Sequence, residues 1–151
     1  FWHRNKKWLF CLHSDIVFDQ KYLENIVISK KRNIVGIHSN NLNKLKHYNL
    51  VVKSNFRDGM INKINYKKEI VNPTGEVIGI NKFSVPTLRK IFNFMEGYFK
   101  KNSKEISWEL LLNKYINLTG DKFFSLKEQT FRWVNINFQR DFRKANKLFK
   151  S

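Results

Sequence analysis

The sequence lacks the features that would cross-link the chain or fix it in a membrane. It has one cysteine, Cys11, so no disulfide framework is available, and the apolar run around it predicts a small buried side chain in a reducing compartment. No segment approaches the roughly 18 consecutive apolar residues that span a bilayer. The first eight residues, FWHRNKKW, lack the apolar core of a signal peptide. These absences favour a cytoplasmic protein with no membrane span.

Acidic residues are also scarce, with 12 Asp and Glu against 29 Lys and Arg, which gives a formal net charge of +17. Such a charge predicts attraction to polyanions, whether nucleic acid, a membrane surface or a phosphorylated small molecule. The cations are scattered, and the densest clusters, at Lys6, Lys30 and Lys100, are short. This dispersal favours a solvated basic surface over a dedicated binding stripe. His13, His38 and His47 show no metal-ligand spacing and are predicted to be surface or capping residues.

The chain nevertheless has the composition of a folded domain. Its apolar share of 42% and aromatic share of 15% exceed what disordered chains contain. Residues 1–151 are predicted to form a single domain, because domains cluster around about 100 to 150 residues.

Hydrophobic periodicity predicts strands and helices that alternate along the chain. We expect strands at 8–12, 33–37, 50–56, 60–66, 76–83, 123–126 and 131–136. We expect helices at 19–29, capped by Asp19 with Tyr22, Leu23, Ile26 and Val27 on one face, at 84–101 after Ser84, from Ser103 or Ser107 to Gly120, and at 138–149. Asp58 and Gly59 supply a tight turn between the third and fourth strands, and a parallel crossover links the first two strands. This order predicts an α/β fold, a mixed sheet with helices on both faces.

One acid stands out in the stretch HSDIVFD, because Asp15 directly follows the first predicted buried strand. In open α/β sheets, ligands bind beyond the carboxyl ends of the strands. A carboxylate there can hold Mg²⁺, which uses one or two protein carboxylates together with substrate phosphates and water. The alternative is that Asp15 only leads into the helix that follows.

Three segments resemble a known family. HSDIVFDQKYLENIV is similar to a metal-binding strand and helix, TGEVIGINKFS to a strand near the acceptor, and FRWVNINFQRDFRKANKLF to a closing strand, turn and helix. Together they resemble the nucleotidyltransferases that join a nucleoside monophosphate to a sugar phosphate or phosphocholine, especially the phosphocholine cytidylyltransferase-like branch. The resemblance implies a three-layer α/β/α, nucleotide-diphospho-sugar transferase-like (Rossmann-like) fold. It covers only the later part of such an enzyme, without the N-terminal phosphate-loop portion.

The resemblance also implies a reaction and a set of site residues. CMP would pass from CTP to a phosphorylated small acceptor, such as phosphocholine or a sugar phosphate, with release of pyrophosphate. Asp15 and Asn137 would bind Mg²⁺, and Asn137 stands where the family has a second acid. The acceptor would meet the following residues: Glu76, Lys82, Trp108, Glu109 and Trp133. The last three would recognise a quaternary ammonium through cation–π attraction and a countercharge, although aromatics at helical spacing, as at Trp108, are usually core.

Two departures from the family pattern bear on activity. The Gly-rich loop that neutralises the triphosphate does not occur in this sequence, and amides replace acids at Asn135 and Asn137. The loss of negative charge predicts weaker metal binding. Two alternatives therefore stay open: a non-catalytic remnant of a nucleotidyltransferase, and a basic module that binds single-stranded nucleic acid. An exposed sheet edge left by missing strands would also allow an oligomer.

Overall fold

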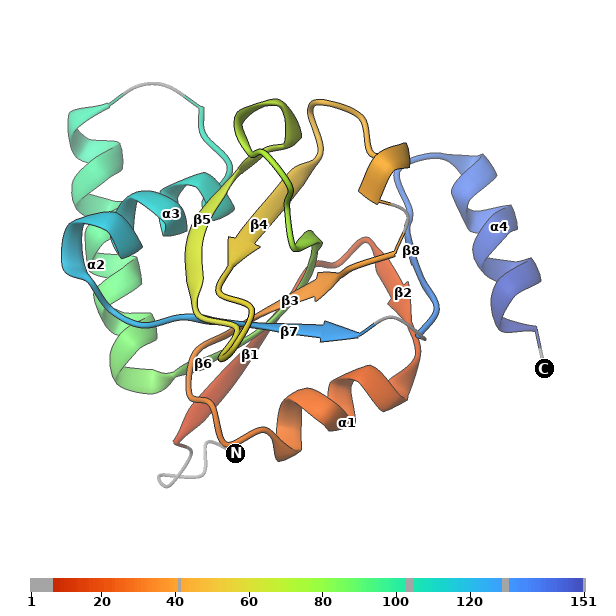
Figure 1. The fold of residues 1–151 in the computed structure, drawn as a ribbon, viewed down its shortest axis with the longest axis horizontal. Helices are drawn as coiled ribbons and strands as arrows, with labels where there is room; N and C mark the ends of the chain where they lie inside the picture. The colour runs from red at the N-terminus through yellow and green to blue at the C-terminus, as the bar shows by residue number, and fades with distance from the viewer. Residues whose placement is uncertain (1–6, 41, 103–104, 129–130, 151) are drawn as a thin grey trace.

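The structure, a computed structural model, describes residues 7–40, 42–102, 105–128 and 131–150. Its elements, in chain order (Figure 1), are β1 (Trp8–Leu12), β2 (Ile16–Phe18), α1 (Gln20–Ile28), β3 (Ile34–His38), η1 (Leu42–Lys44), β4 (Leu50–Ser54), β5 (Ile61–Tyr66), η2 (Lys67–Glu69), β6 (Gly75–Ser84), α2 (Val85–Lys101), α3 (Trp108–Thr119), β7 (Phe124–Glu128), β8 (Trp133–Asn135) and α4 (Gln139–Phe149).

The long strand β6 forms the axis of the main sheet. It pairs antiparallel with β1, from Trp8↔Ser84 to Leu12↔Ile80, and its first residues pair antiparallel with β4. Its other edge pairs antiparallel with β3, which in turn lies parallel to β7. The sheet is therefore mixed, in the order β5-β4-β6-β3-β7 with β1 beside β6.

Alternation along the strands gives the sheet two apolar faces, each covered by helices. One face packs Val35, Ile37 and Phe83 against α2 and α3. The other packs Ile34, Ile78 and Ile80 against α1. Figure 1 shows α2 and α3 together on one side of the sheet and α1 on another. The predicted α/β fold, a mixed sheet with helices on both faces, is confirmed.

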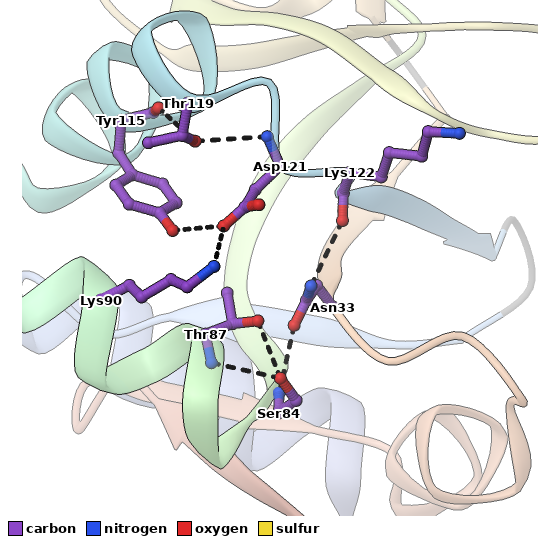
Figure 2. Close-up of polar contacts among 8 residues, drawn as sticks. All are labelled: Asn33, Ser84, Thr87, Lys90, Tyr115, Thr119, Asp121 and Lys122. Atoms are coloured by element: carbon purple, nitrogen blue, oxygen red, sulfur yellow. Dashed lines mark hydrogen bonds and ion pairs between the residues drawn. The ribbon is translucent and has the colours of Figure 1, made fainter.

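Two separate groups of polar contacts lie at the start of α2 and past the end of α3 (Figure 2). The Ser84 hydroxyl accepts from the Thr87 backbone N–H at 3.3 Å and so caps α2. Past the end of α3, the Asp121 carboxylate accepts from the Tyr115 hydroxyl and lies 3.6 Å from the Lys90 ammonium. Burial and this hydrogen bond raise the pKa of Tyr115 to about 12, so its hydroxyl remains a donor at neutral pH. The contacts of Asp121 with Tyr115 and Lys90 thus link α3 to α2.

A separate two-stranded ribbon, formed by β2 and β8, lies beyond the carboxyl end of β1. It is held by Arg132, which precedes β8 and reaches Asp19 at the start of α1. The Asp19 carboxylate accepts from the Arg132 backbone N–H at 2.7 Å and from its guanidinium at 2.8 Å. The same guanidinium donates to the Leu148 carbonyl near the end of α4 at 2.7 Å. One side chain thus joins α1, the ribbon and α4.

Most predicted elements are confirmed within a few residues, and the differences have local causes. Asp19 precedes α1, but its side chain makes no capping hydrogen bond, because it is used by Arg132. Val27, predicted on the buried face of α1, is 48% exposed. The strand β2 was not predicted, because three residues become a strand only by pairing with distant β8. Ser107 caps α3, whereas Ser103 lies outside the described residues.

The predicted crossover from the first to the second strand has the right direction. Both β1 and β3 run antiparallel to β6, so they are parallel to each other, but β6 lies between them. No helix in the described part of the chain is long and apolar enough to cross a membrane.

The contact between Asp19 and Arg132 predicts a pH-dependent contribution to stability. Hydrogen bonds from Arg132 hold the pKa of Asp19 below its ordinary value. A carboxyl whose pKa is lowered by folding stabilises the fold above its unfolded pKa, about 3.9, and that stabilisation is lost as the pH falls through the folded pKa. Asp19→Asn should therefore lower the free energy of unfolding at pH 7 and reduce its decline between pH 5 and pH 2, measured by denaturant titration.

The matched control for this experiment is Glu105→Gln, which neutralises an exposed acid. A pH profile of Asp19→Asn that parallels the unmodified chain at every pH would contradict the prediction.

Candidate active site

The turn after β1 brings Asp15 next to the end of β8. Ile16 lies opposite Asn135 in the β2–β8 ribbon, and the Ile136 backbone N–H donates to the Asp15 carbonyl at 2.6 Å. Asp15 is half-buried and Asn137, one residue beyond this bond, is exposed. The backbone thus places both predicted metal ligands at the same end of the ribbon.

A further carboxylate lies at this end. Asp141, in the first turn of α4, accepts through Oδ2 from the backbone N–H groups of Asn137 at 3.2 Å and Phe138 at 2.9 Å. The sequence analysis did not select Asp141. An acid four residues after Asn137, at the start of a helix, is the signal that would have identified it, since such acids bind the free N–H groups there.

His13, predicted to be a surface or capping residue, contacts both Trp108 and Glu109. The Trp108 Nε1–H donates to His13 Nε2 at 2.8 Å, and Glu109 Oε1 lies 3.3 Å from the same nitrogen. The imidazole rests on the backbone of Gly79, where φ is +72° and an added Cβ would lie 2.4 Å from His13 Cγ. Only glycine allows this approach, and it positions His13 between the sheet and α3.

The two contacts of His13 Nε2 require different protonation states. An indole N–H can only donate, so neutral His13 accepts from Trp108, whereas protonated His13 pairs with Glu109. The hydrogen bond to Glu109 raises the pKa of His13, burial opposes the rise, and the charges of Glu109 and Asp15 add to it. Asp15 is therefore close enough to His13 to act on it through its charge.

A cleft of about 440 Å³ lies beside the ribbon, and Asp141 also lines it. Its lining includes Glu76 from β6, His38 from the end of β3, and Trp133 and Asn135 from β8. Asn49 Nδ2 donates to Glu76 Oε1 at 2.6 Å, and burial raises the pKa of Glu76 above its ordinary value. The Asn135 Oδ1 is buried without a hydrogen-bond partner among the described residues. Such an orphan acceptor marks where a donor can bind.

Cations form part of the lining of this cleft. Lys44 and Lys144 line it directly. Lys144 also belongs to a groove on α4 whose lining is strongly basic and consists of Arg140, Arg143, Lys144, Lys147 and Leu148. The positive charge of the chain is thus more concentrated at α4 than the scattered positions of Lys and Arg in the sequence indicated.

Lys82 does not reach this cleft. Glu76 and Lys82 are six residues apart on one strand, which separates them by about 20 Å. The Lys82 ammonium, only 1% exposed, donates to the carbonyls of Ile26, Val27 and Ser29 at 3.1, 3.3 and 2.7 Å. It therefore caps the carboxyl end of α1, and the expectation that it faces the acceptor together with Glu76 is wrong.

Trp108 and Trp133 also lie apart, on different faces of the sheet. Trp108 packs against the core beneath α2 and α3, whereas Trp133 packs against the core beneath α1 and forms an edge contact with His38. Glu109 therefore lies beside Trp108, its neighbour in the sequence, but not beside Trp133. The three residues do not form one site for a quaternary ammonium.

The oxygen donors at the ribbon end suit a hard cation. Asp15, Asn137 and Asp141 offer carboxylate and amide oxygens, the ligands that Mg²⁺ prefers. Among the described residues, no group of three or more His, Cys, Asp or Glu side chains could hold a metal ion by itself. A Mg²⁺ ion here would need oxygens from its substrate.

No protein-family model matches the chain, and no curated protein matches it. Several solved structures do match the chain. The inositol-1-phosphate CTP transferase from T. maritima aligns with TM-score 0.69 and 18% identity over 91% of this chain and 52% of its own. The CTP:phosphocholine cytidylyltransferase from Streptococcus pneumoniae aligns with TM-score 0.62 and 15% identity over 93% and 57%. A UDP-glucose pyrophosphorylase aligns with TM-score 0.68 and 12% identity over 97% and 57%.

These likenesses show a shared fold, the one that the sequence resemblance implied. The chain spans little more than half the length of each of these structures. Its fold therefore corresponds to part of a nucleotidyltransferase.

The placement of Lys82 predicts a structural role that can be separated from substrate binding. Lys82→Met should lower the free energy of unfolding by about 1–3 kcal/mol, because three carbonyls at the end of α1 lose their donor. Lys21→Met, on the exposed side of the same helix, is the control. Unchanged stability in the Lys82 variant, measured by urea titration, would contradict the capping role.

Proposed function

We propose that the chain takes part in nucleotidyl transfer at the end of the β2–β8 ribbon. A phosphate oxygen of the acceptor attacks the α-phosphorus of a nucleoside triphosphate, the bond to the β-phosphate oxygen breaks, and pyrophosphate leaves. The observation that carries this proposal is the meeting of Asp15 with the segment around Asn137, through the hydrogen bond from Ile136 to Asp15. The fold shared with nucleotidyltransferases supports it.

Asp15 and Asn137 are the proposed ligands of Mg²⁺, with Asp141 close to Asn137. A bound Mg²⁺ would offset the negative charge that develops on the phosphates during transfer. Asp15 contributes the full charge, and Asn137 contributes a neutral amide oxygen. Asp141 orients Asn137 through its backbone N–H and adds negative charge nearby.

The cleft between the ribbon, β6 and α4 is the proposed acceptor site. The unpartnered Asn135 Oδ1 and the half-buried Glu76 can accept hydrogen bonds from an acceptor, while Lys44 and Lys144 can pair with its phosphate. Trp133 offers a ring face to an organic cation such as choline, a contact worth about 0.5–2 kcal/mol.

CTP is the proposed donor, with CMP as the group transferred. Two of the three structures described above are named for the use of CTP, one with an inositol phosphate and one with phosphocholine. Because the chain spans about half of each, nucleotide binding and transfer are separate questions, and both should be measured.

A second candidate function is a basic module that grips single-stranded nucleic acid. The observation in its favour is α4, where four cations line one groove and the nearby rings of Phe138 and Phe142 are 62% and 57% exposed. Cations beside exposed aromatic rings are what such modules use to bind phosphates and stack bases.

The metal site predicts opposite effects of two substitutions. Asp15→Ala should weaken binding of Mg·CTP at least tenfold, because it removes the full charge at the site. Asn137→Asp should tighten binding of Mg²⁺, by up to about tenfold, because it adds a charge. Calorimetric titration with Mg²⁺ and with Mg·CTP measures both effects, and a pyrophosphate-release assay with phosphocholine then tests transfer.

Circular dichroism should show that both variants keep the fold, and Glu24→Ala, an exposed acid on α1, is the charge control. Equal Mg²⁺ affinity in all the variants would mean that the two positions do not share an ion. Nucleotide binding without pyrophosphate release would favour a non-catalytic remnant.

A salt series separates the transferase from the nucleic-acid module. We expect binding of a single-stranded oligonucleotide to be weak and to vanish between about 50 and 200 mM salt, as for non-specific phosphate contacts. Binding of Mg·CTP should persist and depend on Asp15. Tight oligonucleotide binding that Arg143→Ala and Lys147→Ala reduce, with no binding of Mg·CTP, would favour the module.

A further inference from the structure

A second cavity lies on the opposite face of the sheet from the proposed acceptor cleft. It measures about 230 Å³ and lies between the strands β1 and β6 and the helices α2 and α3. Its walls are almost wholly apolar and include Phe83, Leu88, Ile91, Met95 and Trp108. The two most exposed lining residues, Leu12 at 47% and Phe92 at 59%, mark its mouth.

One buried polar side chain, Asn81, interrupts this apolar wall. It is 0% exposed and lines the cavity from the middle of β6. Its Nδ2 donates to the Cys11 carbonyl at 3.4 Å, whereas its Oδ1 is buried without a hydrogen-bond partner among the described residues. A buried acceptor without a partner costs about 1–3 kcal/mol. Leucine at this position of the strand would avoid the free-energy cost of the unpaired acceptor.

A bound water is a poor explanation for the free Asn81 oxygen. A buried water needs two to four polar partners, and the other polar groups at this wall are already used or weak. His13 Nε2 is already used in either protonation state, because it lies 2.8 Å from Trp108 Nε1 and 3.3 Å from Glu109 Oε1. Burial raises the pKa of the Cys11 thiol, which stays neutral and is a weak partner.

The chemistry of the wall defines the ligand. Among the described residues that line the cavity, only His13 can carry a charge, and when protonated it pairs with Glu109 at 3.3 Å. A phosphate or an organic cation would therefore lose its water without a free countercharge. A neutral ligand with an apolar body and a single donor matches one free acceptor in an apolar pocket. An apolar cavity of about 150 Å³ holds benzene, so this larger one has room for a substituted ring.

We propose that this cavity is a binding site for a small neutral molecule with an apolar ring and one hydroxyl or N–H group, which donates to Asn81 Oδ1. The site goes beyond the proposed nucleotidyl transfer. None of the transfer steps uses Asn81, and failure of the transfer proposal would leave this one standing.

The test compares two probes of the same shape, p-cresol and p-xylene, which differ by a hydroxyl in place of a methyl group. The unmodified chain should bind p-cresol roughly tenfold more tightly than p-xylene, because only p-cresol donates to Asn81. Affinities come from ligand-observed NMR titration of the full chain. Equal affinities, or no binding of p-cresol, would overturn the proposal.

Three variants locate the effect. Asn81→Leu should abolish the preference for p-cresol while keeping p-xylene binding, and Met95→Trp should fill the cavity and remove both. Asn146→Leu, an exposed asparagine on α4, should leave both affinities unchanged. A p-cresol preference that survives in Asn81→Leu would overturn the assignment to Asn81; if that variant does not fold, undiminished binding in Met95→Trp would overturn the site.

Discussion

The pairing of β6 with three other strands is the constraint on which the structure depends. Because β1, β3 and β4 all bond to it, each side chain of β6 is fixed to one face and one height in the sheet. Its even-numbered residues face α1 and the ribbon, and its odd-numbered residues face α2 and α3. At Gly79 the strand bulges, and its carbonyl accepts from the His13 N–H at 2.9 Å. That bond fixes the turn that carries Asp15.

This geometry separates groups that the sequence places together. Residues six apart on a helix could share a neighbourhood, but on β6 they lie about 20 Å apart, so Glu76 lines a cleft while Lys82 caps α1. Opposite faces separate Trp108 from Trp133 in the same way. Asp15 lies at the end of the ribbon, with His13 on one side and the segment around Asn137 on the other.

Local signals explain what the sequence could predict. Ser84 and Ser107 accept the capping hydrogen bonds of α2 and α3, and Gly120 takes the left-handed conformation that ends α3. Two runs flanking the turn at Asp58 and Gly59 marked β4 and β5, and alternation marked β6. The sequence did not reveal contacts between distant segments. Examples are the contact of Arg132 with Asp19 and the close approach of His13 to Gly79. These depend on strand register, which no short window of sequence contains, so the predicted grouping of Glu76 with Lys82, and of Trp108 with Trp133, was wrong.

The asparagine at position 137 is consistent with a metal that arrives with its substrate. Of the two proposed ligands only Asp15 is charged, so on this proposal the site would attract a free divalent cation weakly, and the net charge of +17 opposes such binding further. A nucleoside triphosphate carries its own Mg²⁺ on phosphate oxygens, and the same positive charge attracts that complex. On the proposed function, Asp15 and Asn137 would then orient an ion that the phosphates already hold. If that proposal holds, a basic protein with a weak metal site would be better suited to Mg·CTP than to either component alone.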